Sequence, residues 1–237
     1  MKHTGFFLIL FILVFTSYSC TKRTISGNSK VVNQYRNITG FNSVNVVGAY
    51  EVYLKKGEKE LLEIVADENL LPVITSEVSD SVLKISHEKI IIRSKSLKLI
   101  ITYKNISSLN FSGATELSGD SCLSFNNLNI NLSGAGKIDL SLHANRLNAS
   151  ISGGADIDFN GDANQLEVNI TGAANLNTLM LAANNCKIDI SGFGKAKVNA
   201  LKKLEVNISG AGKVEYKGNP ELKQSITGAG KVIKLSD

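Results

Sequence analysis

Apolar and polar residues alternate around a glycine that recurs every 18 to 21 residues through the second half of the chain. Each copy has an apolar residue two positions before the glycine and Ser or Thr directly before it. Alternation with a period of two is typical of a strand with one buried face, and so short a repeat is one coil stacked on similar neighbours. The pattern predicts an all-β fold, a parallel β-helix (solenoid) of about 18–20 residues per coil. The marker glycines of the seven coils are Gly113, Gly134, Gly153, Gly172, Gly192, Gly210 and Gly228.

Positions counted from the marker glycine separate an interior from an exterior. Six and two positions before it, and four after it, the residues are apolar in nearly every coil. Cys186 takes a position that is leucine in other coils, so we expect it to be a small core residue. Cys122 lies about three coils away, roughly 14 Å at one strand spacing per coil, which is too far for a disulfide.

One outward position tests the stacking directly. Five positions before the marker glycine, the sign of the charge alternates in successive coils. In-register parallel stacking makes each of these residues a neighbour of its opposite charge, which an antiparallel meander would not do. The four residues are Glu167, Lys187, Glu205 and Lys223.

The start of the chain has the features of an export signal. A basic start precedes an apolar run, Phe6 to Phe15, that is too short to span a bilayer. Ser19 before Cys20 resembles the lipobox of bacterial lipoproteins, and this resemblance implies a lipid on Cys20. The alternative is an ordinary secretory signal with an incidental cysteine. With the lipid, the expected location is the cell envelope, as an outer-membrane lipoprotein on its periplasmic or its surface side.

The pattern divides the chain into four parts. They are a signal peptide at residues 1–19, a polar tether at 20–36, an irregular β region at 37–106 and the regular solenoid at 107–237. The irregular region begins with a divergent first coil around Gly48, after which the period is lost. We expect it to pack on or cap the solenoid. Within it the sequence predicts strands at 62–66, 82–85 and 97–103 and a helical turn at 67–74.

Composition and motifs exclude several classes of protein. The net charge of +5 is spread along the chain and there is no Trp, whereas nucleic-acid binders concentrate basic and aromatic residues. No nucleic-acid partner is therefore expected. The sequence has no phosphate-binding loop, nucleophile elbow, dinucleotide fingerprint or Cys/His cluster. We expect no cofactor, no metal and no catalytic residue.

Two outward columns are candidates for a binding face. The first column lies three positions after the marker glycine and stacks lysines in consecutive coils. Like charges in such a stack repel one another, which costs energy. A column of this kind would suit an acidic glycan, another acidic polymer or a lipid head group. The alternative is a solvated lysine surface. The other column, three positions before the glycine, is polar throughout and can form a hydrogen-bonded ladder. The candidates are Lys195, Lys213 and Lys231 in the first column and Asn131, Asn169 and Asn207 in the second.

One acidic cluster lies within the coils, at Asp156, Asp158 and Asp162. Residues 153–159 approach a calcium-binding nonapeptide. The residues equivalent to Asp156 in the adjacent coils are Lys137 and Asn175, so shared calcium ligation fails. The sequence favours a solvated acidic turn.

Several phrases resemble the bacterial head GIN domain family. They are the Ser/Thr-Gly-Ala-Gly-Lys copies at residues 133–137, 209–213 and 227–231, and the opening segment 41–54. The resemblance covers about residues 37–235. It implies a right-handed parallel β-helix that forms the head of an adhesin, and it brings no catalytic residues.

Three functions remain open at this point. We favour an exported, lipid-anchored, non-catalytic solenoid that acts in adhesion or glycan binding, with the membrane as a partner through the lipid. The alternative from another class is a carbohydrate-active β-helix enzyme, a polysaccharide lyase or hydrolase, which would need the acidic cluster as its acid–base set. The third is a structural filament built by stacking open coil ends.

Overall fold

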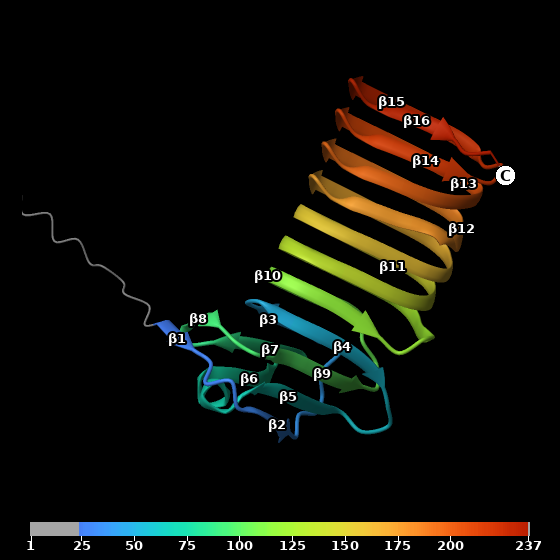
Figure 1. Ribbon diagram of the computed structural model, residues 1–237. Coiled ribbons are helices and arrows are strands. Elements are labelled where there is room, and N and C mark those ends of the chain that lie inside the picture. The colour runs from blue at the N-terminus through green and yellow to red at the C-terminus, as the bar shows by residue number, and fades with distance from the viewer. Residues whose placement is uncertain (1–23, 237) are drawn as a thin grey trace, which may run out of the picture.

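The computed structural model describes residues 24–236 as a nearly all-β protein, with 77% strand and 3% helix. A broad base made by the N-terminal part carries a column of about six coils (Figure 1). The predicted solenoid with an irregular N-terminal β region is therefore confirmed. The elements of the column are β10 (Ser108–Gly119), β11 (Leu123–Gly172), β12 (Asn175–Gly192), β13 (Lys195–Gly210), β14 (Lys213–Lys217), β15 (Glu221–Gly228) and β16 (Lys231–Lys234).

Parallel pairing in register joins the coils. Each marker glycine lies beside the marker glycine of the next coil, as in the pair Gly172 and Gly192. The alternating charge column is also as predicted, since Lys187 pairs with Glu167 on one side and with Glu205 on the other. The Nζ atom of Lys187 lies 3.5 Å from the Oε1 atom of Glu167.

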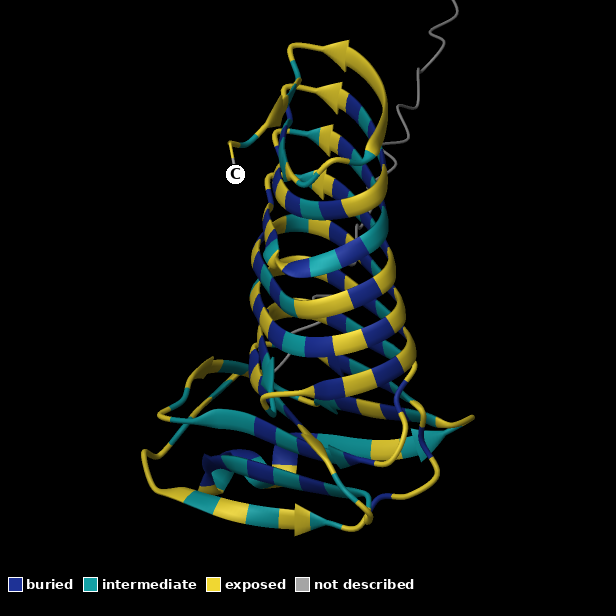
Figure 2. Cartoon of the chain, turned by 90° about the vertical axis from the view of Figure 1, so that its right-hand side faces the viewer, coloured by how far each residue is buried: buried dark blue, intermediate teal, exposed yellow. Residues whose placement is uncertain are grey.

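The interior of the column is a continuous apolar core. Buried residues recur at alternating positions along the coils from β10 to β14, as the banding in Figure 2 shows, whereas β15 at the free end is exposed along its whole length. Cys186 is stacked between Leu166 and Leu204, and its burial raises the pKa of its thiol to about 12. Cys122 is exposed, and both cysteines are free, as predicted.

The base contains the first coil, but the chain does not stack its parts in sequence order. β3 and β4 surround Gly48 and pair in parallel with β10 above them. Below them lie β7 and β9, which come later in the chain yet pair in parallel with β3 and β4. Residues 97–103, predicted as a strand, therefore lie beneath the first coil and do not directly adjoin β10. The bounds are β3 (Ser43–Val47), β4 (Tyr50–Lys56), β7 (Val82–His87) and β9 (Leu97–Tyr103).

Antiparallel strands end the stack at the base. β5 pairs antiparallel with β9 and β2, and β6 pairs antiparallel with β7. The helical turn predicted after β5 is a 3-10 helix, η1. The remaining elements are β1 (Thr24–Ser26), β2 (Val31–Arg36), β5 (Leu61–Asp67), η1 (Glu68–Val73), β6 (Ile74–Ser79) and β8 (Ile90–Arg93).

The expected tether at residues 20–36 is contradicted for its second part. β1 pairs with β8, and β2 pairs with β5 over its whole length. The sequence pattern missed β2 because two of the three residues on its inward face are polar. The Arg36 guanidinium on that face donates hydrogen bonds to the carbonyl oxygens of Leu71 (3.1 Å) and Ile74 (2.9 Å).

A buried carboxylate joins two loops of the base to the end of β5. Asp67 is fully buried and accepts hydrogen bonds from the backbone N–H groups of Ser29, Lys95 (2.8 Å) and Ser96 (3.3 Å). Burial by itself would raise the pKa of Asp67, but these donors outweigh it and lower the pKa. The charged carboxylate therefore stabilises the folded state.

We predict that Asp67→Asn lowers the free energy of unfolding by about 2 kcal/mol at pH 7, because an amide cannot accept all three bonds. A group with a lowered native pKa stabilises above its unfolded pKa and loses that contribution as the pH falls through its native value. The difference between wild type and variant should thus be constant from pH 7 to about pH 5 and shrink below about pH 4. Urea denaturation across this range measures it. Asp139→Asn, an exposed site, is the control, and the same acid dependence there would refute the assignment.

The marker glycines sit where consecutive coils touch through their backbones. At Gly192, φ is +120°, and a Cβ atom would lie 2.7 Å from the carbonyl oxygen of Gly172. A side chain at this position would be strained and would also push the two coils apart.

Gly192→Ala should therefore lower the free energy of unfolding by about 2–4 kcal/mol, measured by urea denaturation followed by circular dichroism. Gly154→Ala is the matched control. The nearest atom to its Cβ would be the carbonyl oxygen of Ala173 at 3.9 Å, so its effect should stay within about 0.5 kcal/mol. If the two variants lose the same free energy of unfolding, the close approach of the glycine backbones does not determine the stability of the stack.

Candidate functional site

The strand segment before each marker glycine presents four outward columns, which together form a surface that we call the ladder face. The columns lie seven, five, three and one positions before the glycine. The two nearest the glycine are uncharged except at Asp189, whereas the other two carry most of the charge. The ladder face thus has a neutral side and a charged side.

A shallow groove, here called the polar groove, runs along the neutral side. It consists of two hollows of about 380 and 310 Å³ that share Asn169 and Thr171. Its floor is apolar and is formed by the residues two before the glycine, such as Ile170 and Ile190. One wall consists of Asn45, Asn110, Asn131, Ser150, Asn169, Asp189, Asn207 and Ser225, and the other includes Ser112, Ser133, Ser152, Thr171, Ser191, Ser209 and Thr227.

Amide side chains on the first wall bond from coil to coil. Asn131 Nδ2 donates to Asn110 Oδ1 at 2.8 Å, and Asn207 Nδ2 donates to Asp189 Oδ1 at 2.6 Å. Each amide has two N–H groups. At Asn131 the bond along the ladder leaves one of them for a ligand, whereas Asn207 Nδ2 also donates to Glu205 Oε1 at 3.4 Å. The structure thus brings the candidates Asn131, Asn169 and Asn207 together on one wall.

The lysine candidates lie on a different surface. Lys195, Lys213 and Lys231 pair in register, as expected, but on the strand segment that follows the glycine corner. Neither hollow of the polar groove is lined by any of them. The predicted binding face therefore divides into two separate surfaces.

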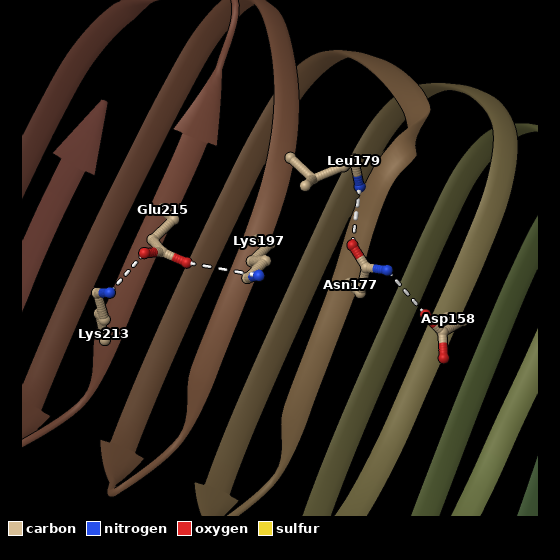
Figure 3. Close-up of polar contacts among 6 residues, drawn as sticks. All are labelled: Asp158, Asn177, Leu179, Lys197, Lys213 and Glu215. Atoms are coloured by element: carbon tan, nitrogen blue, oxygen red, sulfur yellow. Dashed lines mark hydrogen bonds and ion pairs between the residues drawn. The ribbon is translucent and has the colours of Figure 1, made fainter. Parts of the chain in front are cut away.

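Glu215, which the sequence analysis did not single out, changes the charge of the lysine column. Its carboxylate accepts a hydrogen bond from Lys213 Nζ and lies 3.9 Å from Lys197 Nζ (Figure 3). The hydrogen bond from Lys213, with the positive charges of Lys213, Lys197 and Lys195, lowers the pKa of Glu215 despite its partial burial. Glu215 stays ionised and offsets part of the positive potential. The alternation of lysine and glutamate two residues apart was the signal for it in the sequence.

The acidic cluster is dispersed. Asp156 accepts a hydrogen bond from Asn175 Nδ2 (2.8 Å), and Asp158 accepts one from Asn177 Nδ2 (2.9 Å; Figure 3). Asp162 lies beyond the next bend and pairs with His143 Nδ1. Within residues 24–236 no group of three or more His, Cys, Asp or Glu residues is placed to hold a metal ion.

The charged side of the ladder face holds a second groove of about 490 Å³. Its floor is formed by Leu166, Cys186 and Leu204. The alternating column predicted from the sequence lines one side of it. The opposite side, which the sequence analysis missed, consists of Arg146, Gln165, Asn185, Lys203 and Glu221.

A second asparagine column was also missed, although it is visible in the sequence. Eight positions before the marker glycine, five consecutive coils have asparagine, and we call this column the outer ladder. Asn164 Nδ2 donates to Asn145 Oδ1 at 3.3 Å, and Asn184 Nδ2 donates to Asn164 Oδ1 at 3.2 Å. Its members are Asn105, Asn126, Asn145, Asn164 and Asn184.

The chain belongs to the family described as "Putative auto-transporter adhesin, head GIN domain", which matches residues 40–220. The family resemblance seen in the sequence is thereby confirmed. No curated relative matches the chain. Because adhesin heads act outside the cytoplasm, the family indicates an extracellular or envelope location.

Solved structures share this fold. A "putative adhesin" from Bacteroides fragilis is 24% identical, with a TM-score of 0.83, over 89% of this chain and all (100%) of that one. A "Putative lipid binding protein" from Parabacteroides distasonis is 22% identical, with a TM-score of 0.73, over 90% of this chain and 100% of that one. A "putative adhesin" from Parabacteroides merdae is 22% identical, with a TM-score of 0.69, over 90% and 100% of the two chains.

The candidate lipidation site, Cys20, lies outside the residues that the structure describes. Over residues 24–236, no helix has the length and apolar character needed to cross a membrane.

The contact between Glu215 and the lysine column leads to a measurable prediction. Glu215→Gln should strengthen retention on a sulfated-polysaccharide resin, because it removes the carboxylate that offsets Lys213 and Lys197. The measurement is the salt concentration at elution. Glu63→Gln, which changes the net charge equally but lies in the base next to Asn33, is the control. If both variants elute at the same salt concentration, net charge alone controls retention and the lysine column does not act as a surface.

Proposed function

We propose that this protein is a non-catalytic adhesin head, held at the cell envelope by a lipid on Cys20, that binds a polysaccharide along its polar groove. Membership of the adhesin-head family and the likeness to structures named "putative adhesin" support the adhesin role. The Ser19–Cys20 pair at the end of the signal supports the lipid anchor. One structural neighbour is named a "Putative lipid binding protein", which is compatible with attachment to a membrane.

The observation that carries the proposal is the repetition of the polar groove. Every coil contributes one apolar floor residue between two outward polar side chains, and successive coils repeat this set at about 4.8 Å. A polymer of repeating units lying along the axis can make the same contact with coil after coil. Each contact is weak, and the total affinity grows with the number of coils engaged.

The chemistry of the groove suits carbohydrate better than protein or lipid. Hydroxyls and amides, such as Thr171 and Asn169, both donate and accept hydrogen bonds, as sugar hydroxyls do. The floor is apolar but narrow, since Ile170 and Ile190 are nearly buried. It offers contact to the C–H face of a sugar and too little area for a lipid chain.

The contacts of the acidic residues support a non-catalytic role. A glycoside hydrolase needs two carboxyl groups that face one bond of the substrate. Asp156 and Asp158 instead accept hydrogen bonds from asparagines of the next coil, and Asp162 belongs to another bend of the chain. Their contacts are those of a structural ladder.

The proposal is tested with the purified full chain on an array of bacterial and host polysaccharides, followed by affinity measurements on any polysaccharide retained. The double variant Asn169→Ala/Thr171→Val alters the two residues shared by both hollows and should weaken binding about tenfold, the value of one or two hydrogen bonds. Asn175→Ala in the same coil, on the other side of the corner, is the matched control and should bind like wild type. Failure of every polysaccharide to bind, or equal losses in both variants, would refute the groove as the site.

A further inference from the structure

A separate pocket lies where the base meets the column. It has a volume of about 290 Å³, at the small end of the range for ligand sites. The residues that line it come from the ends of β4 and β9, from the segments just before β3 and β10, and from the start of β11. It lies apart from both grooves of the ladder face, with which it shares no lining residue.

Two aromatic rings form the apolar part of this pocket. Tyr103 and Phe125 are stacked, with ring centroids 6.1 Å apart and planes inclined by 11°. Tyr103 is fully buried, and within residues 24–236 its hydroxyl has no hydrogen-bond partner. A buried hydroxyl without a partner is costly, and a ligand hydroxyl is the kind of group that it lacks.

Amide groups surround the aromatic pair. Asn105 and Asn126 are the first two members of the outer ladder, and Asn127 follows directly. Further along the ladder, Asn145, Asn164 and Asn184 bond to one another. At the pocket, by contrast, none of the three amides has a hydrogen-bond partner anywhere in the described part of the chain. The ladder thus leaves its first amides free at the pocket.

Lys56 supplies the single charged side chain among the pocket-lining residues. Its Nζ atom lies 5.3 Å from the centroid of the Tyr103 ring and donates a hydrogen bond to the carbonyl oxygen of Lys104. An ammonium group has three donors, so two remain for a ligand.

We propose that this pocket binds a single sugar unit that carries a carboxylate, a hexuronic acid. The amides match the ring hydroxyls, Phe125, the ring of the pair that keeps some exposure, matches the C–H face, and the Lys56 ammonium matches the carboxylate. The pocket goes beyond the proposed polar groove, because it recognises one unit, or the end of a chain, through different residues. It can bind its ligand whether or not the groove binds a polymer.

The test uses the full chain with glucuronate and glucose as probes, with ligand-observed NMR and calorimetry as measurements. Glucuronate should bind, and glucose should bind about tenfold more weakly. Lys56→Met should weaken glucuronate binding about tenfold and leave glucose binding unchanged, whereas Asn126→Ala should weaken both. Asn164→Ala is the control, since it removes a bonded rung of the same ladder and should lower the unfolding midpoint without altering binding.

Two outcomes would overturn this site, namely no binding of glucuronate, or an equal effect of Lys56→Met on the two sugars. The double variant Asn169→Ala/Thr171→Val distinguishes binding at the polar groove from binding at this pocket. That variant should leave glucuronate binding unchanged, so failure of either site can be recognised while the other stands.

Discussion

Backbone contact between consecutive glycine corners is the constraint on which the rest of the column depends. At each corner the chain needs a positive φ, and the carbonyl oxygen of the coil before occupies the space that a Cβ atom would fill, as at Gly172 and Gly192. Since only glycine meets both conditions, one residue per coil fixes the register. A slip of one residue would place a side chain at the corner and turn the whole apolar row outward. The corner therefore selects one stacking arrangement among many that the alternating pattern alone would permit.

The fixed register places residues at the same offset in successive coils directly above one another on the surface. Identical offsets become columns, and each column can be neutral, alternating or of one sign. The Glu167–Lys187 column is stabilised by alternation. Beyond the corner, Glu215 is the acidic residue that the structure of residues 24–236 places against the lysines. Exposed pairs of this kind contribute little to stability, about 0–1 kcal/mol each. Their arrangement is better explained by the pattern of charge that it creates on the surface than by a contribution to the stability of the fold.

The period, the first coil around Gly48 and the core position of Cys186 could all be predicted from the sequence, because each depends on offsets within one coil. The strand β2 could not, because two of the three residues on its half-buried face, Gln34 and Arg36, are polar. Nor could the order of the base, since the chain returns beneath its own first coil before it begins β10. For the site, the offsets gave the asparagine wall, but they could not show that the glycine corner separates it from Lys213. The pocket at Tyr103 joins the ends of strands distant in sequence. The asparagine period marks Asn105 and Asn126, but no periodic signal marks Lys56 or the aromatic pair.

The asparagines of the outer ladder fall into two groups, those whose amides stabilise the stack and those whose amides are available to a ligand. An amide that bonds to the coil above and the coil below has used one donor and its acceptor, so it stabilises the stack and contributes little specificity. Asn164 is in this state, bonded on both sides. Where the column meets the irregular base, these bonds stop, and Asn105 and Asn126 keep their hydrogen-bonding capacity beside a buried aromatic pair. Along the length of a repeat fold, the polar side chains of neighbouring coils bond to one another. A site that recognises individual groups of a ligand is therefore expected where the repeat is interrupted.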